Sequence, residues 1–366
     1  STTVLRLIMM HVHSVGRASA SSGQVVGAVA RCVTLPFFRP SHLTSQQNAH
    51  AFRFCFEYLC REGLLIPQPD ENGVTNMAVS DVAGLITHLH YTEPSNFAFL
   101  SLLTSGLLSD LCEDFNCPKA DVNRELRLVL VLCHLFNRRP LSPHLETLVS
   151  EKRITGPSIV QLPELDQKVR DTLNGANERA LKTFCDYLMC FSRAYKEELG
   201  LDDMLPFSRV RCGATEDAFG SAKVPPELLR LAQSVSMRSN FVALSGHGDD
   251  TFRTVTELCA TLRRGLHMDP AMLPVLPEAN GPLNSYLFDF YKHGQQQALV
   301  RFNGLQRESL WEGLRDFELV LRAIAAAMRW RYDKNYDVSV FHNTVVVEAL
   351  EDIAREFSSK LSAMAS

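Results

Sequence analysis

The stretch that decides the fold is GLITHLHYTEPSNFAFL, residues Gly84 to Leu100. Its first half contains His88, His90 and a tyrosine, and its second half opens with Thr-Glu-Pro. A threonine can cap a helix, and glutamate and proline are favoured in the first helical turn. We therefore predict that a helix begins here, and that the residues before it form the joint between two pieces of structure.

The two histidines are also candidates for a metal or acid–base site. Two residues apart, they point away from each other on a helix and can share a face only on a strand. No cysteine or carboxylate is suitably placed in the sequence to complete a ligand set. We expect packing at a domain seam instead, formed by His88, His90, Tyr91 and Pro94.

Before this joint, the sequence predicts two helices and a hairpin. Apolar residues at helical spacing predict helices over Thr3–Val15 and Ser45–Arg61, and Gly63 is a suitable stop for the second. Two short apolar runs then flank PDENG, residues 69–73, which is typical of a hairpin turn. Helix, helix and hairpin in this order are expected of a winged-helix fold.

After the joint, the pattern is mainly helical. Glu125–Phe136 is apolar on nearly every side, which predicts a helix buried at the centre of a helical domain. An amphipathic helix is expected around Gly175–Tyr195. Residues 205–282 are rich in Gly, Pro and Ser and are expected to be irregular, with one helix near Thr254–Arg264. Three helices are predicted to close the chain: Leu283–Lys292, Glu308–Tyr332 and Phe341–Met364.

These elements predict a mainly α fold, in which a winged-helix module with a small β-wing is followed by a helical bundle with an irregular insertion. The expected domains are a winged helix over residues 1–94, a helical domain over 95–204, an irregular segment with short strands and a helix over 205–282, and C-terminal helices over 283–366 that pack on the helical domain. Apolar runs are too short for a membrane span, so no membrane partner is expected.

Composition limits the classes of function. The net charge is -4, from 37 basic and 41 acidic residues, so any contact with a polyanion must come from a local patch. The ten cysteines include no C-x-x-C pair, which gives no support to a zinc ribbon or a redox motif. We expect reduced thiols in a cytoplasmic protein.

Motifs for catalysis are weak. A P-loop requires G-x-x-x-x-G-K-[ST], and the sequence has no such run, so we do not expect this chain alone to hydrolyse ATP. The string SGHGDD contains His247 and Asp249, which suggest a self-contained hydrolase. Catalytic triads converge from separate loops, however, so two glycines around a histidine favour a turn before a helix cap. We expect no catalytic, cofactor-binding or metal site.

An arginine row on the Glu308–Tyr332 helix is the candidate binding feature. Arg315, Arg322 and Arg329 recur every seven residues and therefore lie on one slowly drifting stripe. Such a row can follow a phosphate backbone, which makes these three residues candidates for an RNA-facing surface. It can equally be a solvated face that pairs with the nearby glutamates Glu308, Glu312 and Glu318.

The sequence resembles the C-terminal region of superkiller-type superfamily 2 DExD/H RNA helicases, with the greatest similarity to the DEAD-box protein 60-like antiviral helicases and their fungal relatives. Five strings carry this resemblance and follow one another in the expected order: HLHYTEPSNF (88–97), LVLVLCHLFNR (128–138), FVALSGHGD (241–249), LNSYLFDFYKHG (283–294) and LRDFELVL (314–321).

The resemblance implies an accessory region without catalytic residues, which braces two RecA-like domains outside this chain and guides RNA. It implies ATP and Mg²⁺ in that motor core and none in this chain. The implied partners are RNA, reached through the whole helicase, and the protein's own RecA domains. The alternative is a protein-interaction scaffold that docks RNA-sensing or RNA-decay proteins without touching RNA.

Overall fold

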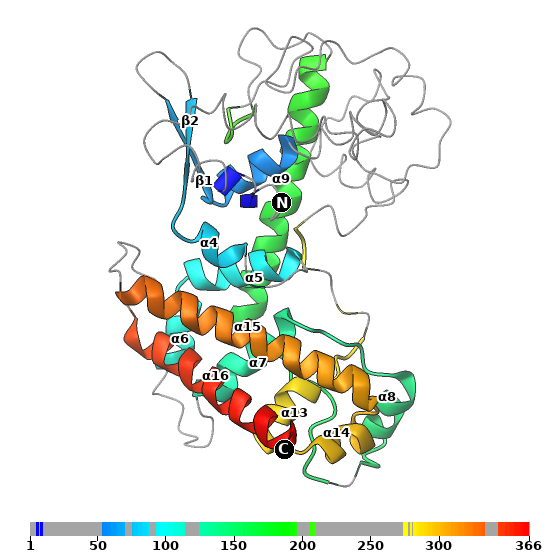
Figure 1. The fold of residues 1–366 in the computed structure, drawn as a ribbon. Helices are drawn as coiled ribbons and strands as arrows, with labels where there is room; N and C mark the ends of the chain where they lie inside the picture. Colours follow the sequence, from blue (N-terminus) through cyan, green and yellow to red (C-terminus); the bar gives the residue numbers. More distant parts are fainter. Residues whose placement is uncertain are drawn as a thin grey trace. The chain divides into compact units, whose positions relative to one another are not determined.

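The computed structural model describes residues 5–6, 8–9, 53–69, 75–87, 89, 93–113, 124–154, 156–195, 205–209, 274–276, 279, 281–333 and 343–365. Within these ranges the chain is mostly helical and has a single two-stranded antiparallel sheet (Figure 1). The expectation of a mainly α fold is therefore confirmed. The chain forms two compact units, of which one comprises residues 1–87 with 177–275 and the other 88–176 with 276–366.

The domain boundaries expected after residues 94, 204 and 282 stay predictions. Residues 5, 6, 8 and 9 are helical, in line with the first predicted helix, whose other residues lie outside the described ranges. The helix expected near residues 254–264 lies wholly outside them.

In the first unit, a helix over residues 53–61 is followed by Gly63, which stops it as the sequence predicts. Gly63 has a φ of 69°, and its N–H donates to the Cys60 carbonyl while the Leu64 N–H donates to the Leu59 carbonyl. These two bonds form a Schellman cap, in which a left-handed residue satisfies the last carbonyls of a helix. Glycine suits this position because it has no Cβ to clash at positive φ.

The hairpin follows this cap. Strand β1 (Leu65–Pro69) pairs antiparallel with β2 (Thr75–Val79), with Leu65 opposite Val79 and Pro69 opposite Thr75. Of the predicted turn at residues 69–73, Pro69 is the last residue of β1, and residues 70–73 lie outside the described ranges. A short helix, α4 (Ala83–Ile86), comes next and buries Ala83, Leu85 and Ile86. The winged-helix assignment itself stays a prediction.

Aromatic side chains build the core of the first unit. Helix α9 (Gln167–Tyr195) begins in the second unit, and its residues from Asn177 onward belong to the first. Phe54 meets Phe184 of α9 edge-to-face at 5.3 Å between ring centroids and Tyr187 at 6.1 Å. All three rings are fully buried. Such aromatic pairs stabilise a core beyond the area that they bury.

The second unit is a helical bundle. Its helices besides the start of α9 are α5 (Glu93–Thr104), α6 (Leu107–Glu113), α7 (Arg124–Leu135), α8 (Pro143–Ser150), α13 (Tyr286–His293), α14 (Gln296–Phe302), α15 (Arg307–Asp333) and α16 (Thr344–Ala365). The start of α5 at Glu93 confirms the helix predicted from Thr-Glu-Pro. In Figure 1 α15 and α16 lie side by side, and α7 and α13 pack beneath them.

Helix α7 lies at the centre of this bundle, as its composition predicts. None of its twelve residues is exposed, and Leu128, Val129 and Leu132 are almost completely buried. The neighbouring helix α5 is tied to its end, because the Ser95 Oγ donates a hydrogen bond to the Leu135 carbonyl at 2.5 Å.

Helix α13 begins three residues later than the predicted Leu283. Leu283 and Asn284 instead form β-bridges with Pro140 and Gln161, and Ser285 is the residue before the helix. Backbone N–H groups in this segment therefore have partners outside any helix: Asn284 donates to the Arg139 carbonyl and Ser285 donates to the Val160 carbonyl, each at 2.9 Å. Helix α13 ends at His293, and Gly294 caps it with a φ of 67°.

Candidate nucleic-acid interface

Helix α15 carries the predicted arginine row, and its opposite side anchors it in the bundle. Five apolar residues that share this side are all buried: Leu314, Phe317, Leu321, Ile324 and Met328. Their spacing of three or four residues is that of one helix face. The ring of Phe317 packs edge-to-face on Phe357 of α16 at 5.4 Å between centroids.

A glycine fixes how closely α15 approaches its neighbours. A Cβ added to Gly313 would lie 2.9 Å from the Tyr286 hydroxyl oxygen and 3.2 Å from a guanidinium nitrogen of Arg139. The Gly313 carbonyl accepts a hydrogen bond from the side-chain amide of Asn137 at 3.0 Å. The Tyr286 hydroxyl in turn donates to the Asn137 carbonyl, also at 3.0 Å. A larger residue at position 313 therefore requires either the Tyr286 side chain or α15 to shift.

The other side of α15 presents an exposed stripe. Between Glu312 and Asp333, the exposed residues of this helix recur every three or four positions, and we call them the α15 stripe: Arg315, Leu319, Arg322, Ala326 and Trp330. Leu319 is 51% exposed and Trp330 is 49% exposed. The stripe thus combines two cations with two large apolar side chains, and the exposed carboxylates Glu312 and Asp333 lie at its two ends.

The three predicted arginines have different surroundings. Arg315 is exposed and makes no ion pair with another described residue. Arg322 is exposed but lies 3.4 Å from the carboxylate of Glu318 one turn earlier. Arg329 lies beside the stripe, because an α-helix drifts about 20° per heptad relative to a seven-residue repeat. Its two guanidinium N–H groups bind both carboxylate oxygens of Glu351, and the Nε donates at 2.8 Å.

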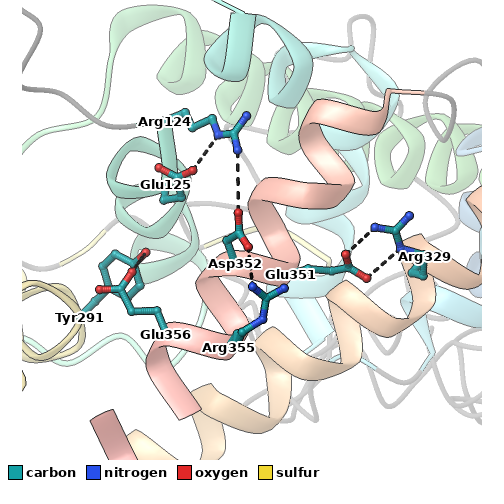
Figure 2. A network of polar contacts seen from close by, with 8 residues as sticks. All are labelled: Arg124, Glu125, Tyr291, Arg329, Glu351, Asp352, Arg355 and Glu356. Carbon is teal, nitrogen blue, oxygen red and sulfur yellow. Dashed lines mark hydrogen bonds and ion pairs between the residues drawn. The ribbon is translucent and has the colours of Figure 1, made fainter. Parts of the chain in front are cut away.

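Helix α16 supplies three carboxylates, each of which contacts a different helix (Figure 2). Glu351 binds Arg329 of α15. Asp352 lies 3.9 Å from Arg124 of α7 and 3.1 Å from Arg355 of its own helix. Glu356 accepts a hydrogen bond from the Tyr291 hydroxyl of α13 at 2.8 Å. This polar network joins four helices of the bundle.

The charges in this network perturb one another. Hydrogen bonds from Arg329 lower the pKa of Glu351, and the same pair raises the pKa of Arg329. Burial, together with the hydrogen bond to Glu356, raises the pKa of Tyr291. Burial opposes ionisation of Glu356, but hydrogen bonds from Lys360 and Tyr291 leave its pKa lowered. The network therefore holds paired charges, which is typical of a structural role rather than acid–base catalysis.

The predicted domain seam is described only in part. His88, His90 and Tyr91 lie outside the described ranges, and so do His247 and Asp249. Pro94 is the second residue of α5 and is buried. The N-terminal segment of the first unit ends at Thr87, close to the predicted joint. The seam assignment of these residues stays a prediction.

No group of three histidine, cysteine, aspartate or glutamate side chains suited to hold a metal ion occurs among the described residues. Their helices also include none that is both long and apolar enough to span a bilayer.

Sequence reasoning missed two features of α15. The exposure of Leu319 and Trp330 was not foreseen, although the string RWRYD (329–333) alternates cations and aromatic rings, which is a signal for single-stranded nucleic acid. The Glu351 partner of Arg329 was also missed, because it lies 22 residues away on another helix.

Comparisons with known proteins relate the chain to helicases. An uncharacterised helicase of Dictyostelium discoideum is 28% identical over 292 residues, and a human protein named probable ATP-dependent RNA helicase DDX60-like is 26% identical over 291. These matches cover 76% and 77% of this chain but only 14% and 16% of the two relatives. No family model and no solved structure matches. The chain is therefore a helicase-related region, as the sequence resemblance predicted.

Proposed function

We propose that this chain is a non-catalytic accessory region of an ATP-dependent RNA helicase, which braces RecA-like motor domains and guides RNA along α15. The observation that carries this proposal is that about three quarters of this chain is similar to two helicases. The matched part makes up about one seventh of the length of each helicase. A segment of that size, with no P-loop of its own, fits an accessory part of a larger motor.

ATP and Mg²⁺ are proposed to bind the motor domains and not this chain. The residues here do not fit a nucleotide, because the sequence has no glycine-rich loop followed by lysine to surround its phosphates. On the same resemblance, we propose a cytoplasmic protein that acts in RNA remodelling or in an antiviral response to RNA.

The α15 stripe supports contact with RNA. Since the whole chain has a net charge of -4, a polyanion needs a local surface that presents cations. Arg315 and Arg322 provide two exposed cations on such a surface. The side chain of Arg322 is 66% exposed in its ion pair with Glu318, so its solvent-facing side is accessible to a phosphate group.

A binding experiment with matched variants tests this proposal. The chain is titrated into a fluorescently labelled oligouridylate at low salt, and anisotropy reports binding. We expect the triple variant R315A/R322A/R329A to lose most of the affinity, because phosphate contacts supply nearly all non-specific binding. A chain that does not bind unpaired RNA, or a triple variant that binds as tightly as the wild type, would contradict RNA guidance by α15.

The control variant is R153A/K168A/R170A. It removes the same number of charges from exposed positions in the same unit. It also matches the test variant in its ion pairs, since Arg153 pairs with Glu151 and Arg170 with Glu164 while Lys168 makes none with another described residue. We expect this variant to bind RNA as the wild type does. An equal loss in both variants would mean that only net charge matters.

A further inference from the structure

Helix α9 is continuous across the boundary between the two units. It extends over 29 residues, and the boundary lies between Ala176 and Asn177. The chain crosses between the units at two other places, after Thr87 and after Val275, and the residues described there are not helical. Among the described residues, α9 is thus the element that must bend if the units change their orientation.

The buried face of α9 is interrupted at this boundary. Buried residues follow one side of the helix in both halves: Val169 and Leu173 in the first, and Ala180, Phe184 and Tyr187 in the second. None of residues 174–179 between them is buried. Since a helix in a protein derives most of its stability from the packing of its apolar face, this part of α9 receives little support from the core.

The sequence of the interrupted part also favours opening. It begins with Asn174 and Gly175, which Ala176 and Asn177 follow. Glycine is the poorest helix former apart from proline, and asparagine is among the weaker ones. Glycine also lacks a Cβ, which gives its backbone a wide range of conformations once a hydrogen bond of the helix opens. Weak helix propensity and the gap in the buried face therefore coincide.

The two halves of α9 are each fixed within their own unit. At the end of the interruption, Arg179 lies 3.5 Å from Glu62, and further along Asp186 lies 3.4 Å from Arg61. All four residues belong to the first unit. In the first half, which belongs to the second unit, Val169 is 1% exposed. Bending is therefore concentrated in the short part between the two anchored halves.

From these observations we propose that residues 174–178 form a hinge, at which α9 opens and bends so that the two units reorient while each keeps its own core. The hinge is a conformational device of the chain itself and requires neither RNA nor a partner protein. It is therefore independent of RNA guidance by α15, and a chain that does not bind oligouridylate leaves it unaffected.

Hydrogen exchange of the full chain, resolved to single amides by mass spectrometry, tests the hinge. After correction for intrinsic rates, we expect the amides of residues 175–178 to exchange faster than those of the neighbouring turns on either side. N174A and G175A favour the closed helix and are expected to slow this exchange by about threefold and about fivefold, respectively. E178G is expected to speed it by about threefold. The control K168A replaces an exposed residue in the first half of α9 and is expected to leave it unchanged.

A second measurement relates this opening to movement of the units. Spin labels are attached to keto amino acids introduced at Gln68 and Lys152, which are exposed residues of the first and the second unit, so the native cysteines stay unlabelled. Double electron–electron resonance gives the distribution of distances between the labels, and we expect this distribution to narrow in N174A/G175A.

Two results would overturn the hinge. One is that residues 175–178 exchange as slowly as the neighbouring turns. The other is that the distribution of distances is the same in the wild type and in N174A/G175A. If the Cβ added at position 175 disturbs the fold, which thermal melting detects, N174A alone decides both tests, because Asn174 is exposed.

Discussion

Arg329 of α15 binds both carboxylate oxygens of Glu351 in α16, two helices that are adjacent along the chain and in space. In this bidentate geometry, two parallel hydrogen bonds fix the orientation of the guanidinium group and add to the attraction between the charges. It also means that a phosphate group must displace Glu351 before it can bind Arg329. The arginine row of α15 is therefore unequal, with Arg315 and Arg322 more accessible than Arg329.

A double-mutant cycle measures the Arg329–Glu351 pair. We expect R329A and E351A to be non-additive in the free energy of unfolding by up to about 1 kcal/mol, because both side chains are partly exposed. Urea denaturation of the two single variants and the double variant gives this coupling. The more exposed pair of Arg170 with Glu164 serves as control and is expected to couple less. Full additivity at Arg329 and Glu351 would contradict the contact.

The lowered pKa of Glu351 predicts a dependence of stability on pH. The folded state favours the ionised carboxylate, so its contribution is complete above the ordinary glutamate pKa of about 4.3 and is lost as the pH falls through the lower folded value. In E351Q this part of the acid sensitivity should disappear. Unfolding free energies measured at a series of pH values from neutral to acid test it, and parallel curves for wild type and variant would refute it.

The raised pKa of Asp289 predicts the opposite dependence of stability on pH. Its side chain is 1% exposed and accepts a hydrogen bond from the Ile159 N–H at 2.6 Å. Burial raises its pKa, although this hydrogen bond and the nearby His293 oppose the shift. The folded state therefore binds a proton more tightly than the unfolded state, and the contribution of Asp289 declines as the pH rises above about 4.

The variant D289N keeps the acceptor oxygen and removes the charge. We expect its stability relative to the wild type to increase as the pH rises through the raised pKa of Asp289, because only the wild type then buries a charge there. D316N, which removes a carboxylate from a less buried position on α15, controls for the loss of one charge. A difference between D289N and the wild type that does not vary with pH would rule out this account.

At Gly313 we predict that substitution by alanine lowers stability, although helix propensity alone would favour alanine. Alanine is the better helix former by about 1 kcal/mol, yet G313A is expected to lower the free energy of unfolding by about 1–3 kcal/mol because its Cβ meets buried Tyr286. Tyr286→Phe removes the nearest atom, the hydroxyl oxygen at 2.9 Å, and should reduce the cost of G313A when combined with it. Thermal denaturation of the four proteins provides the test, and a more stable G313A would contradict the close approach.

The parts of this fold that could be predicted are those that local sequence determines. The apolar period of α15, the glycine stops at Gly63 and Gly294, and the Thr-Glu-Pro start of α5 each depend on residues within one or two turns. The bridges of Leu283 and Asn284 could not be predicted, because they need Pro140 and Gln161 from distant parts of the chain.

The same distinction holds for the candidate site. The pairing of Arg322 with Glu318 follows from their spacing on one helix, and it was among the predicted alternatives. The exposure of Trp330 depends on which face of α15 the rest of the bundle covers. Trp330 lies beside the apolar face, and the spacing of apolar residues along the helix does not determine whether an aromatic residue at such a position is buried or exposed.

The salt dependence of RNA binding tests RNA guidance by α15 most directly. The slope of log K against log salt for single strands is about -0.7 for each phosphate that the protein neutralises. If Arg315 and Arg322 each neutralise one phosphate, R315A/R322A should bind oligouridylate with a slope that is shallower by about 1.4 than that of the wild type. Equal slopes for the two proteins would show that these arginines do not contact the RNA backbone.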